Sequence, residues 1–109
     1  MENQDSQFKT EIDTRLQEDW GISDSDARAA ILEWVFKNIN TLNTRLTQTL
    51  RTEDWSKMQD LAETLCTFAE NIDNSRLKKI SSQMLEASRS KDSLQGLATS
   101  EEFHRLLRK

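Results

Sequence analysis

The residues that interrupt helices are almost missing from this chain, and this feature constrains its fold more than any other. The 109 residues include no proline, no tyrosine and only two glycines, and nowhere do β-branched residues alternate with polar ones. Proline and glycine are the strongest local breakers of regular structure, and alternation is typical of a half-buried strand. Because the chain lacks both signals, its sequence predicts an all-α fold.

Composition and charge exclude several classes of protein. Hydrophobic residues make up 35% of the chain and charged residues 31%, which suits one domain, residues 1–109, with a modest core and a solvated surface. Within it, we expect residues 1–5 to be disordered. The net charge is −4 and the basic residues are scattered, so we expect no nucleic-acid partner. No stretch approaches about 20 apolar residues, so we expect no membrane-spanning segment.

Cysteine and histidine are too scarce for a metal centre. Cys66 is the only cysteine and His104 the only histidine, and they lie far apart in the sequence. A metal site needs several such ligands close together, so we expect neither a metal nor a cofactor. A lone cysteine cannot form an internal disulfide, which fits a reducing, cytoplasmic location. Cys66 is either a half-buried space filler or a redox-sensitive thiol.

Apolar residues at helical spacing divide the chain into a short first helix and further helical segments. They recur every three or four residues, the period of one helix face. The sets are Phe8, Ile12 and Leu16; Ile31, Val35, Ile39, Leu42, Leu46 and Leu50; Trp55, Met58, Leu61, Leu65, Phe68 and Ile72; Leu77, Ile80, Met84 and Ala87; and Leu94, Leu97, Phe103, Leu106 and Leu107. The phase drifts near Gly96, where we expect a kink or a split. Short connections favour antiparallel neighbours, so we predict an up-down antiparallel four-helix bundle with an additional short N-terminal helix.

The helix predicted from Trp55 to Ile72 carries a polar outer face. The residues that share it are Ser56, Gln59, Asp60, Glu63, Thr67 and Glu70, with Cys66 at its edge. At about 100° per residue, Glu63 lies about 160° from the centre of the apolar stripe. We therefore expect Glu63 to point into solvent. The three tryptophans, Trp20, Trp34 and Trp55, are expected in the core or at its boundary.

The sequence around this face resembles the central motif of histidine-phosphotransfer (HPt) domains. That family carries an acidic-aromatic turn, a helix reading Ala-His-x-Leu-Lys-Gly, a second turn, and a helix ending in Leu-Glu-x-Ala-x-x-x-x-Asp. The corresponding segments here read Asp54-Trp55, Ala62-Glu63-Thr64-Leu65-Cys66-Thr67, Asn71-Ile72-Asp73-Asn74, and Leu85-Glu86-Ala87-Ser88-Arg89-Ser90-Lys91-Asp92. The resemblance covers roughly residues 25–109, and it implies the HPt fold.

The departures from the family pattern fall on its active site. Glu63 occupies the position of the phosphorylated histidine, Cys66 that of the lysine and Thr67 that of the glycine. In the family the imidazole takes a phosphoryl group from one aspartate and passes it to another, and the lysine helps to neutralise the phosphoryl oxygens. A carboxylate cannot replace the imidazole as nucleophile and repels anions. The resemblance therefore implies a pseudo-HPt protein without catalytic residues.

The resemblance also implies a function, that of a non-catalytic interaction module, monomeric or weakly dimeric. Its implied partner is the receiver domain of a response regulator or hybrid kinase, in a phosphorelay that the chain modulates without carrying phosphate. The implied contact surface consists of Leu32, Phe36, Gln59, Asp60, Glu63, Thr67 and Glu70.

Several alternatives stay open. Glu63 either imitates the charge of a phosphorylated histidine or is an ordinary solvated residue. Leu32 and Phe36 are either an exposed docking patch or covered by the first helix. A second function is that of a structural bundle that dimerises or docks to an unrelated protein. A third is that of a working phosphotransferase that uses His104 or Cys66.

Overall fold

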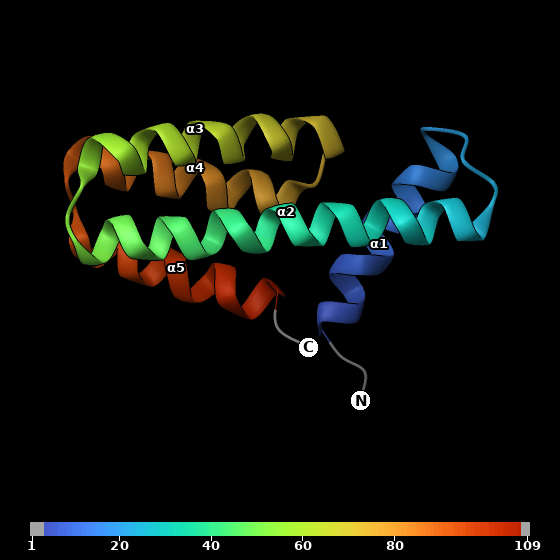
Figure 1. The fold of residues 1–109 in the computed structure, drawn as a ribbon, viewed down its shortest axis with the longest axis horizontal. Coiled ribbons are helices and arrows are strands. Elements are labelled where there is room, and N and C mark those ends of the chain that lie inside the picture. Colours follow the sequence, from blue (N-terminus) through green and yellow to red (C-terminus); the bar gives the residue numbers. More distant parts are fainter. Residues whose placement is uncertain (1–3, 108–109) are drawn as a thin grey trace.

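A computed structural model describes residues 4–107 of the chain, with side chains from Gln7 onward (Figure 1). All regular structure in this range is α-helical, which confirms the predicted class. The five helices are α1 (Gln4–Glu18), α2 (Ser25–Arg51), α3 (Trp55–Ile72), α4 (Ser75–Ser90) and α5 (Ser93–Leu107). Of the segment expected to be disordered, residues 1–3 lie outside the described residues, and α1 begins at Gln4.

Polar residues define where the helices begin and end. Gly21 adopts a φ of 71° between α1 and α2, a conformation that costs glycine little. Asp24, Asp54 and Asn74 each accept a hydrogen bond from a first-turn backbone N–H and so cap α2, α3 and α4. Asp73 ends α3 in the left-handed conformation with a φ of 51°. The turns between α2 and α5 are therefore short, and each reverses the chain.

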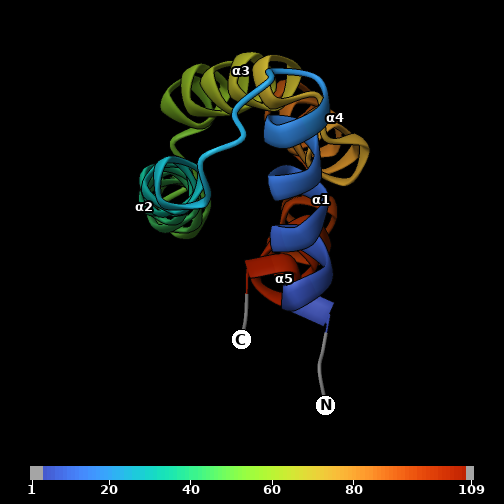
Figure 2. The ribbon, with the colours of Figure 1, turned by 90° about the vertical axis from the view of Figure 1, so that its right-hand side faces the viewer.

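Helices α2, α3, α4 and α5 lie side by side and run alternately in opposite directions (Figure 1). Viewed along α2, the other three are arranged around a shared interior, and α1 crosses their end (Figure 2). Helix α1 contacts α2 and α5. At 1.5 Å per residue, α2 is about 40 Å long and α3 about 27 Å, so α2 extends beyond the α3–α4 hairpin. This overhang is where α1 packs.

The core is built from the apolar stripes of all five helices. Phe8, Ile12 and Leu16 of α1 are buried, as their spacing predicts. The other large buried side chains belong mainly to α2, α3 and α4, and include Val35, Ile39, Leu46, Met58, Leu65, Leu77, Ile80 and Met84. Phe103 is fully buried in α5. The short first helix is thus part of the core rather than an appendage.

Helix α5 differs from the prediction in two ways. It runs unbroken from Ser93 to Leu107 through Gly96, so the helix is not split there. A Cβ at Gly96 would lie only 2.7 Å from Cδ1 of Leu50, which shows that the glycine permits close approach to α2. The helix therefore turns its small residues inward, whereas Leu94 and Leu97 are 79% and 56% exposed instead of buried.

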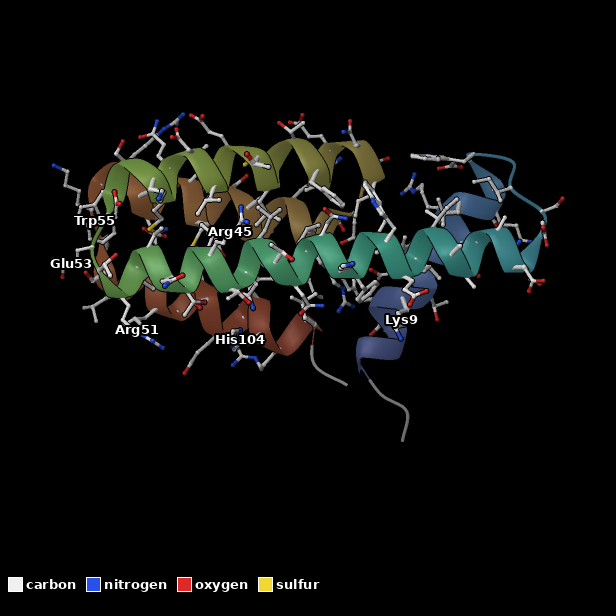
Figure 3. The ribbon with its side chains drawn as sticks, in the orientation of Figure 1. Lys9, Arg45, Arg51, Glu53, Trp55 and His104 are labelled. Carbon is white, nitrogen blue, oxygen red and sulfur yellow. The ribbon has the colours of Figure 1, made fainter. Side chains whose placement is uncertain are left out.

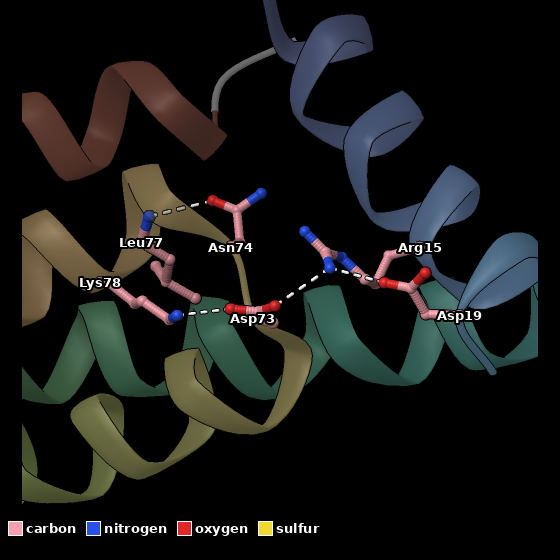
Figure 4. A network of polar contacts seen from close by, with 6 residues as sticks. All are labelled: Arg15, Asp19, Asp73, Asn74, Leu77 and Lys78. Carbon is pink, nitrogen blue, oxygen red and sulfur yellow. Dashed lines mark hydrogen bonds and ion pairs between the residues drawn. The ribbon is translucent and has the colours of Figure 1, made fainter.

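Ion pairs tie α1 to the turn between α3 and α4 (Figure 4). Arg15 lies 3.0 Å from Asp73, and Lys78 pairs with the other carboxylate oxygen of Asp73. The hydrogen bond and charge of Lys78, together with the charge of Arg15, hold the pKa of Asp73 below its usual value. Nearby, the Asn74 amide donates to Glu11 at 3.0 Å. The position of α1 is thus fixed by polar contacts as well as by its apolar face.

Candidate functional site

Glu63 lies in the middle of the exposed face of α3, as its helical phase predicts. Its carboxylate accepts one hydrogen bond, from Gln59 Nε2 at 3.3 Å, one helical turn earlier. Asp60, Thr67 and Glu70 are also exposed, and Gln59 is half-buried. No salt bridge between residues in the described part of the chain involves Asp60, Glu63 or Glu70. This face therefore presents three carboxylates to solvent.

The neighbours of Glu63 are poorly placed for nucleophilic chemistry. The Thr67 hydroxyl donates to the backbone carbonyl of Glu63 at 3.2 Å and so serves the helix itself. Cys66 is a half-buried free thiol at the edge of this face. A reactive thiol or hydroxyl needs a base or a cation beside it. The face around Glu63 is acidic, and the Thr67 hydroxyl on it is bonded to the helix backbone.

Phe36 lies under the first helix, which supports one of the two alternatives for the Leu32 and Phe36 pair. The rings of Phe8 and Phe36 lie 5.3 Å apart, and Lys9 Nζ lies 5.6 Å from the centre of the Phe36 ring. Leu32 is half-buried and lines a shallow groove with Phe36, Lys9 and Leu107. The contacts of Phe36 with Phe8 and Lys9 help to seat α1 on α2.

The structure separates the Leu32 and Phe36 pair from Glu63. Trp34 lies on the side of α2 that faces α3, where it stacks on Phe68. Residues two positions apart in a helix point about 160° apart, so Phe36 faces away from α3. The predicted contact surface therefore does not form one patch. The residues of this surface on α3 share the outer face of that helix. Leu32 and Phe36 lie instead on the side of α2 that is nearer to α1.

An apolar groove that the sequence did not predict lies where α1, α2 and α3 meet. It encloses about 360 Å³, and its walls include Ile12, Leu16, Trp20, Ile31, Trp34 and Phe68. Trp34 is 60% exposed and Trp20 53% exposed, so the expectation that both lie in or at the edge of the core is wrong. Trp20 stands beside a short polar turn, but nothing in the sequence around Trp34 distinguished it from a core residue. We call this feature the Trp34 groove.

His104 makes a contact that disfavours a role as nucleophile. Its Nδ1 lies 2.8 Å from Nδ2 of Asn43, an amide nitrogen that can only donate. One of the two ring nitrogens is therefore engaged in a contact with α2 and is not free to act as a nucleophile. The side chain is exposed on α5, far along the chain from Glu63.

The sequence matches no protein-family model, and no match was found among curated proteins or among solved structures. The HPt resemblance therefore stays a prediction from the motifs quoted above. Across residues 4–107 no helix is both long and apolar enough to cross a membrane. The same residues contain no group of three or more potential ligands arranged to hold a metal ion.

Proposed function

We propose that this chain is a degenerate HPt domain that binds a receiver domain without carrying phosphate. On this proposal α2, α3, α4 and α5 are the up-down antiparallel four-helix bundle of the HPt fold, and α1 is the additional N-terminal helix. The partner is the receiver domain of a response regulator or hybrid kinase, and the location is the cytoplasm. By binding the receiver domain, the chain modulates a two-component phosphorelay. It either competes with other proteins for the receiver or alters the receiver itself.

The observation that carries this proposal is the exposure of Glu63 at the position of the phosphorylated histidine. In the resemblance this position faces the incoming partner, and here its carboxylate meets solvent with one hydrogen bond, to Gln59. Asp60 and Glu70 lie on the same exposed face. A permanent negative charge in that place supports contact with a protein surface. It does not by itself support chemistry, because the neighbouring Thr67 donates its hydroxyl to the helix backbone.

Calorimetric titration of the chain against receiver domains tests the proposal. The charge-reversing variant Glu63→Lys is expected to weaken binding by about tenfold or more, the loss that one interfacial charge contact can cause. Glu101→Lys is the matched control, since Glu101 is an exposed glutamate on α5 and its reversal should leave binding unchanged. Titrations run with and without an aspartyl-phosphate mimic on the receiver. Absence of binding to every receiver in both states, or equal losses in the two variants, contradicts the proposal.

A second candidate is a structural bundle that dimerises or docks to an unrelated protein. The exposure of Trp34 and Trp20 favours it, because large aromatic side chains in a groove are typical anchors of protein interfaces. Light scattering separates the two candidates. A stable dimer that Trp34→Asp converts to a folded monomer would favour this second function. A wild-type monomer that binds a receiver through Glu63 favours the first.

A further inference from the structure

The Trp34 groove is a concavity enclosed by three helices rather than a flat patch on one of them. Its walls include Ile12 and Leu16 of α1, Trp34 of α2 and Phe68 of α3, and Trp20 adds a further wall from the turn after α1. The volume of about 360 Å³ lies near the lower end of the range for small-molecule sites, about 300–1,000 Å³. The groove therefore has the size for a molecule of about two rings.

Aromatic side chains give the groove a preference for flat ligands. Trp34 and Phe68 stack with their ring centroids 5.9 Å apart, so the indole is aligned before any ligand arrives. Most of the indole surface of Trp34 and of Trp20 is nevertheless exposed. An aromatic ligand can make stacked or edge-to-face contacts with these rings, and a saturated ring of the same size cannot. The lining therefore favours a planar aromatic molecule.

The charge in the groove lining is already neutralised. Among the lining residues of the described chain, Arg15 is the one that is charged. Its Nη1 lies 3.0 Å from a carboxylate oxygen of Asp73 and also pairs with Asp19 (Figure 4). An anionic ligand would have to displace one of these carboxylates, and a cationic ligand would be repelled by the guanidinium. The groove therefore favours a neutral ligand.

Asn71 supplies a polar contact at the edge of the groove. It lies one helical turn after Phe68 on α3, lines the groove and is exposed to solvent. Its side-chain amide has both N–H donors and an oxygen acceptor. A hydroxyl or a ring N–H on a ligand can therefore form a hydrogen bond there. A few polar groups among apolar walls are what orient a ligand in a small-molecule site.

The apolar surface is too small to hold a second copy of this chain. At their observed exposures, Trp20 and Trp34 together offer roughly 250 Å². A stable protein interface needs about 800 Å² from each partner, with few charged residues at its centre. The groove residues have exposed acidic chain neighbours: Asp19 precedes Trp20, Glu33 precedes Trp34, and Glu70 lies in the last turn of α3. A symmetric dimer through this surface would bring these carboxylates close to their own copies.

We propose that the Trp34 groove binds a small, neutral, planar aromatic molecule that carries one hydrogen-bonding group, in the class of phenols, naphthols and indoles. The rings of the ligand lie against Trp20, Trp34 and Phe68, and its polar group bonds to the Asn71 amide. This site competes with dimerisation, the second candidate function, for the same aromatic surface. It is independent of receiver binding, because Glu63 takes no part in it.

Titration of the full chain with 2-naphthol, which is uncharged at neutral pH, tests the proposal. Two-dimensional ¹H–¹⁵N NMR spectra resolve the indole N–H signals of the three tryptophans. We expect the signals of Trp20 and Trp34 to shift along one common saturation curve, with a Kd on the order of 0.1 mM for so small a ligand. Trp55 is the internal control, because it lies beside Glu53 at the end of the bundle remote from α1 (Figure 3).

Three relatives of this ligand test its required chemistry. Naphthalene-2-sulfonate carries a negative charge, decahydro-2-naphthol has the hydroxyl without the aromatic rings, and naphthalene has the rings without the hydroxyl. Each is expected to bind about fivefold more weakly or worse, because each lacks one property that the lining selects. Equal affinity for the sulfonate or for the saturated alcohol would contradict the assigned ligand class.

Substitutions test the residues that form the site. Trp34→Ala should weaken 2-naphthol binding by about tenfold. Asn71→Leu should weaken the binding of 2-naphthol but leave that of naphthalene unchanged, since naphthalene has no group for the amide to bond. Leu94→Ala is the matched control, because Leu94 is an exposed apolar residue of α5 outside the groove. All three variants alter exposed side chains, and circular dichroism establishes that each is folded.

Three further results would overturn the proposal. The first is that the Trp20 and Trp34 signals do not move up to the solubility limit of 2-naphthol. The second is that Trp55 shifts as much as they do, which would indicate nonspecific binding. The third is that the Trp34 signal changes on dilution of the chain alone, which would mean that a second copy fills the groove. None of these results bears on the receiver titration, which depends on Glu63→Lys.

Discussion

Trp34 of α2 and Phe68 of α3 stack at an interplanar angle of 23°, although the tryptophan is 60% exposed. Phe68 is half-buried against the core, so one ring of the pair is held by the fold and the other rests on it. An aromatic pair of this kind adds only about 0.5–1.5 kcal/mol beyond the area it buries. Trp34 is thus aligned by a contact that contributes little to stability, and most of its indole surface is left for another molecule.

Replacing Trp34 by alanine should therefore cost little stability. We expect Trp34→Ala to lower the free energy of unfolding by about 1 kcal/mol, the value of the lost stacking. Phe8→Ala should cost about 3–5 kcal/mol, because Phe8 is fully buried and its removal leaves a cavity. Urea denaturation followed by circular dichroism measures both. A loss above about 3 kcal/mol for Trp34→Ala would mean that the indole is a structural side chain after all.

Truncating Phe36 should loosen α1 selectively. Its ring contacts Phe8 at 5.3 Å, so Phe36→Ala removes the support for the first helix and is expected to cost about 2 kcal/mol. Hydrogen exchange should show faster exchange of the α1 amides and unchanged protection in α3 and α4. If α1 keeps its wild-type protection, the ring does not seat the helix, and the docking-patch alternative for Phe36 regains support.

Gly96 and Leu50 should be energetically coupled. A Cβ at Gly96 would overlap the Leu50 side chain at 2.7 Å, so Gly96→Ala gains helix propensity but overpacks the interface between α2 and α5. Leu50→Val shortens the obstructing side chain. In a double-mutant cycle, Gly96→Ala should be more favourable by about 1 kcal/mol in the Leu50→Val background than in the wild type. Additive effects in the cycle would show that the two positions do not touch.

The stabilising contribution of Asp73 should disappear in acid. Lys78 and Arg15 lower the pKa of Asp73 in the folded chain, so its carboxylate stabilises the fold at pH values above the unfolded aspartate pKa of about 3.9. That contribution is lost as the pH falls through the lowered folded value. Asp73→Asn removes the charge, and asparagine tolerates the left-handed backbone at this position.

We therefore expect the wild type to be more stable than Asp73→Asn at neutral pH, with the difference shrinking as the pH falls below the unfolded aspartate pKa of about 3.9 and vanishing below the lowered folded pKa. Urea midpoints measured for both proteins between neutral and acidic pH provide the comparison. Asp26→Asn serves as the control, because Asp26 is exposed in the first turn of α2 and pairs with no cation within residues 4–107. A difference between wild type and Asp73→Asn that persists unchanged in acid would contradict the assigned ion pairs.

Local signals were enough to predict most of the fold. The spacing of Phe8, Ile12 and Leu16 identified the buried face of α1, and the same period gave the outward direction of Glu63. The turn expected at Asp54-Trp55 is where α3 begins, with Asp54 as its cap. These predictions succeeded because they depend only on the periodicity of a single helix and on the hydrogen bonds at its ends.

The predictions that failed concern which helix lies beside which. Periodicity gives the centre of an apolar stripe but does not say which helix covers its flanks. Phe36 lies on one flank of α2 and Trp34 on the other, and the sequence could not show that the first is covered and the second exposed. Leu94 and Leu97 were placed inside because they are apolar. Their exposure follows from the close approach of α5 to α2. Gly96 lets α5 lie close to Leu50, so the glycine side of the helix faces inward. The separation of two backbones is set by tertiary packing, which no single segment encodes.

The overhang of α2 beyond the α3–α4 hairpin makes the first helix and the Trp34 groove a single thermodynamic unit. Ile12, Leu16 and Trp20 supply one wall, so the groove exists only while α1 is docked. Any molecule that fills the groove must then stabilise the docked position of α1, and any change that detaches α1 must weaken binding in the groove by the same free energy. The docking of α1 and the occupancy of the groove can therefore each be measured through the other.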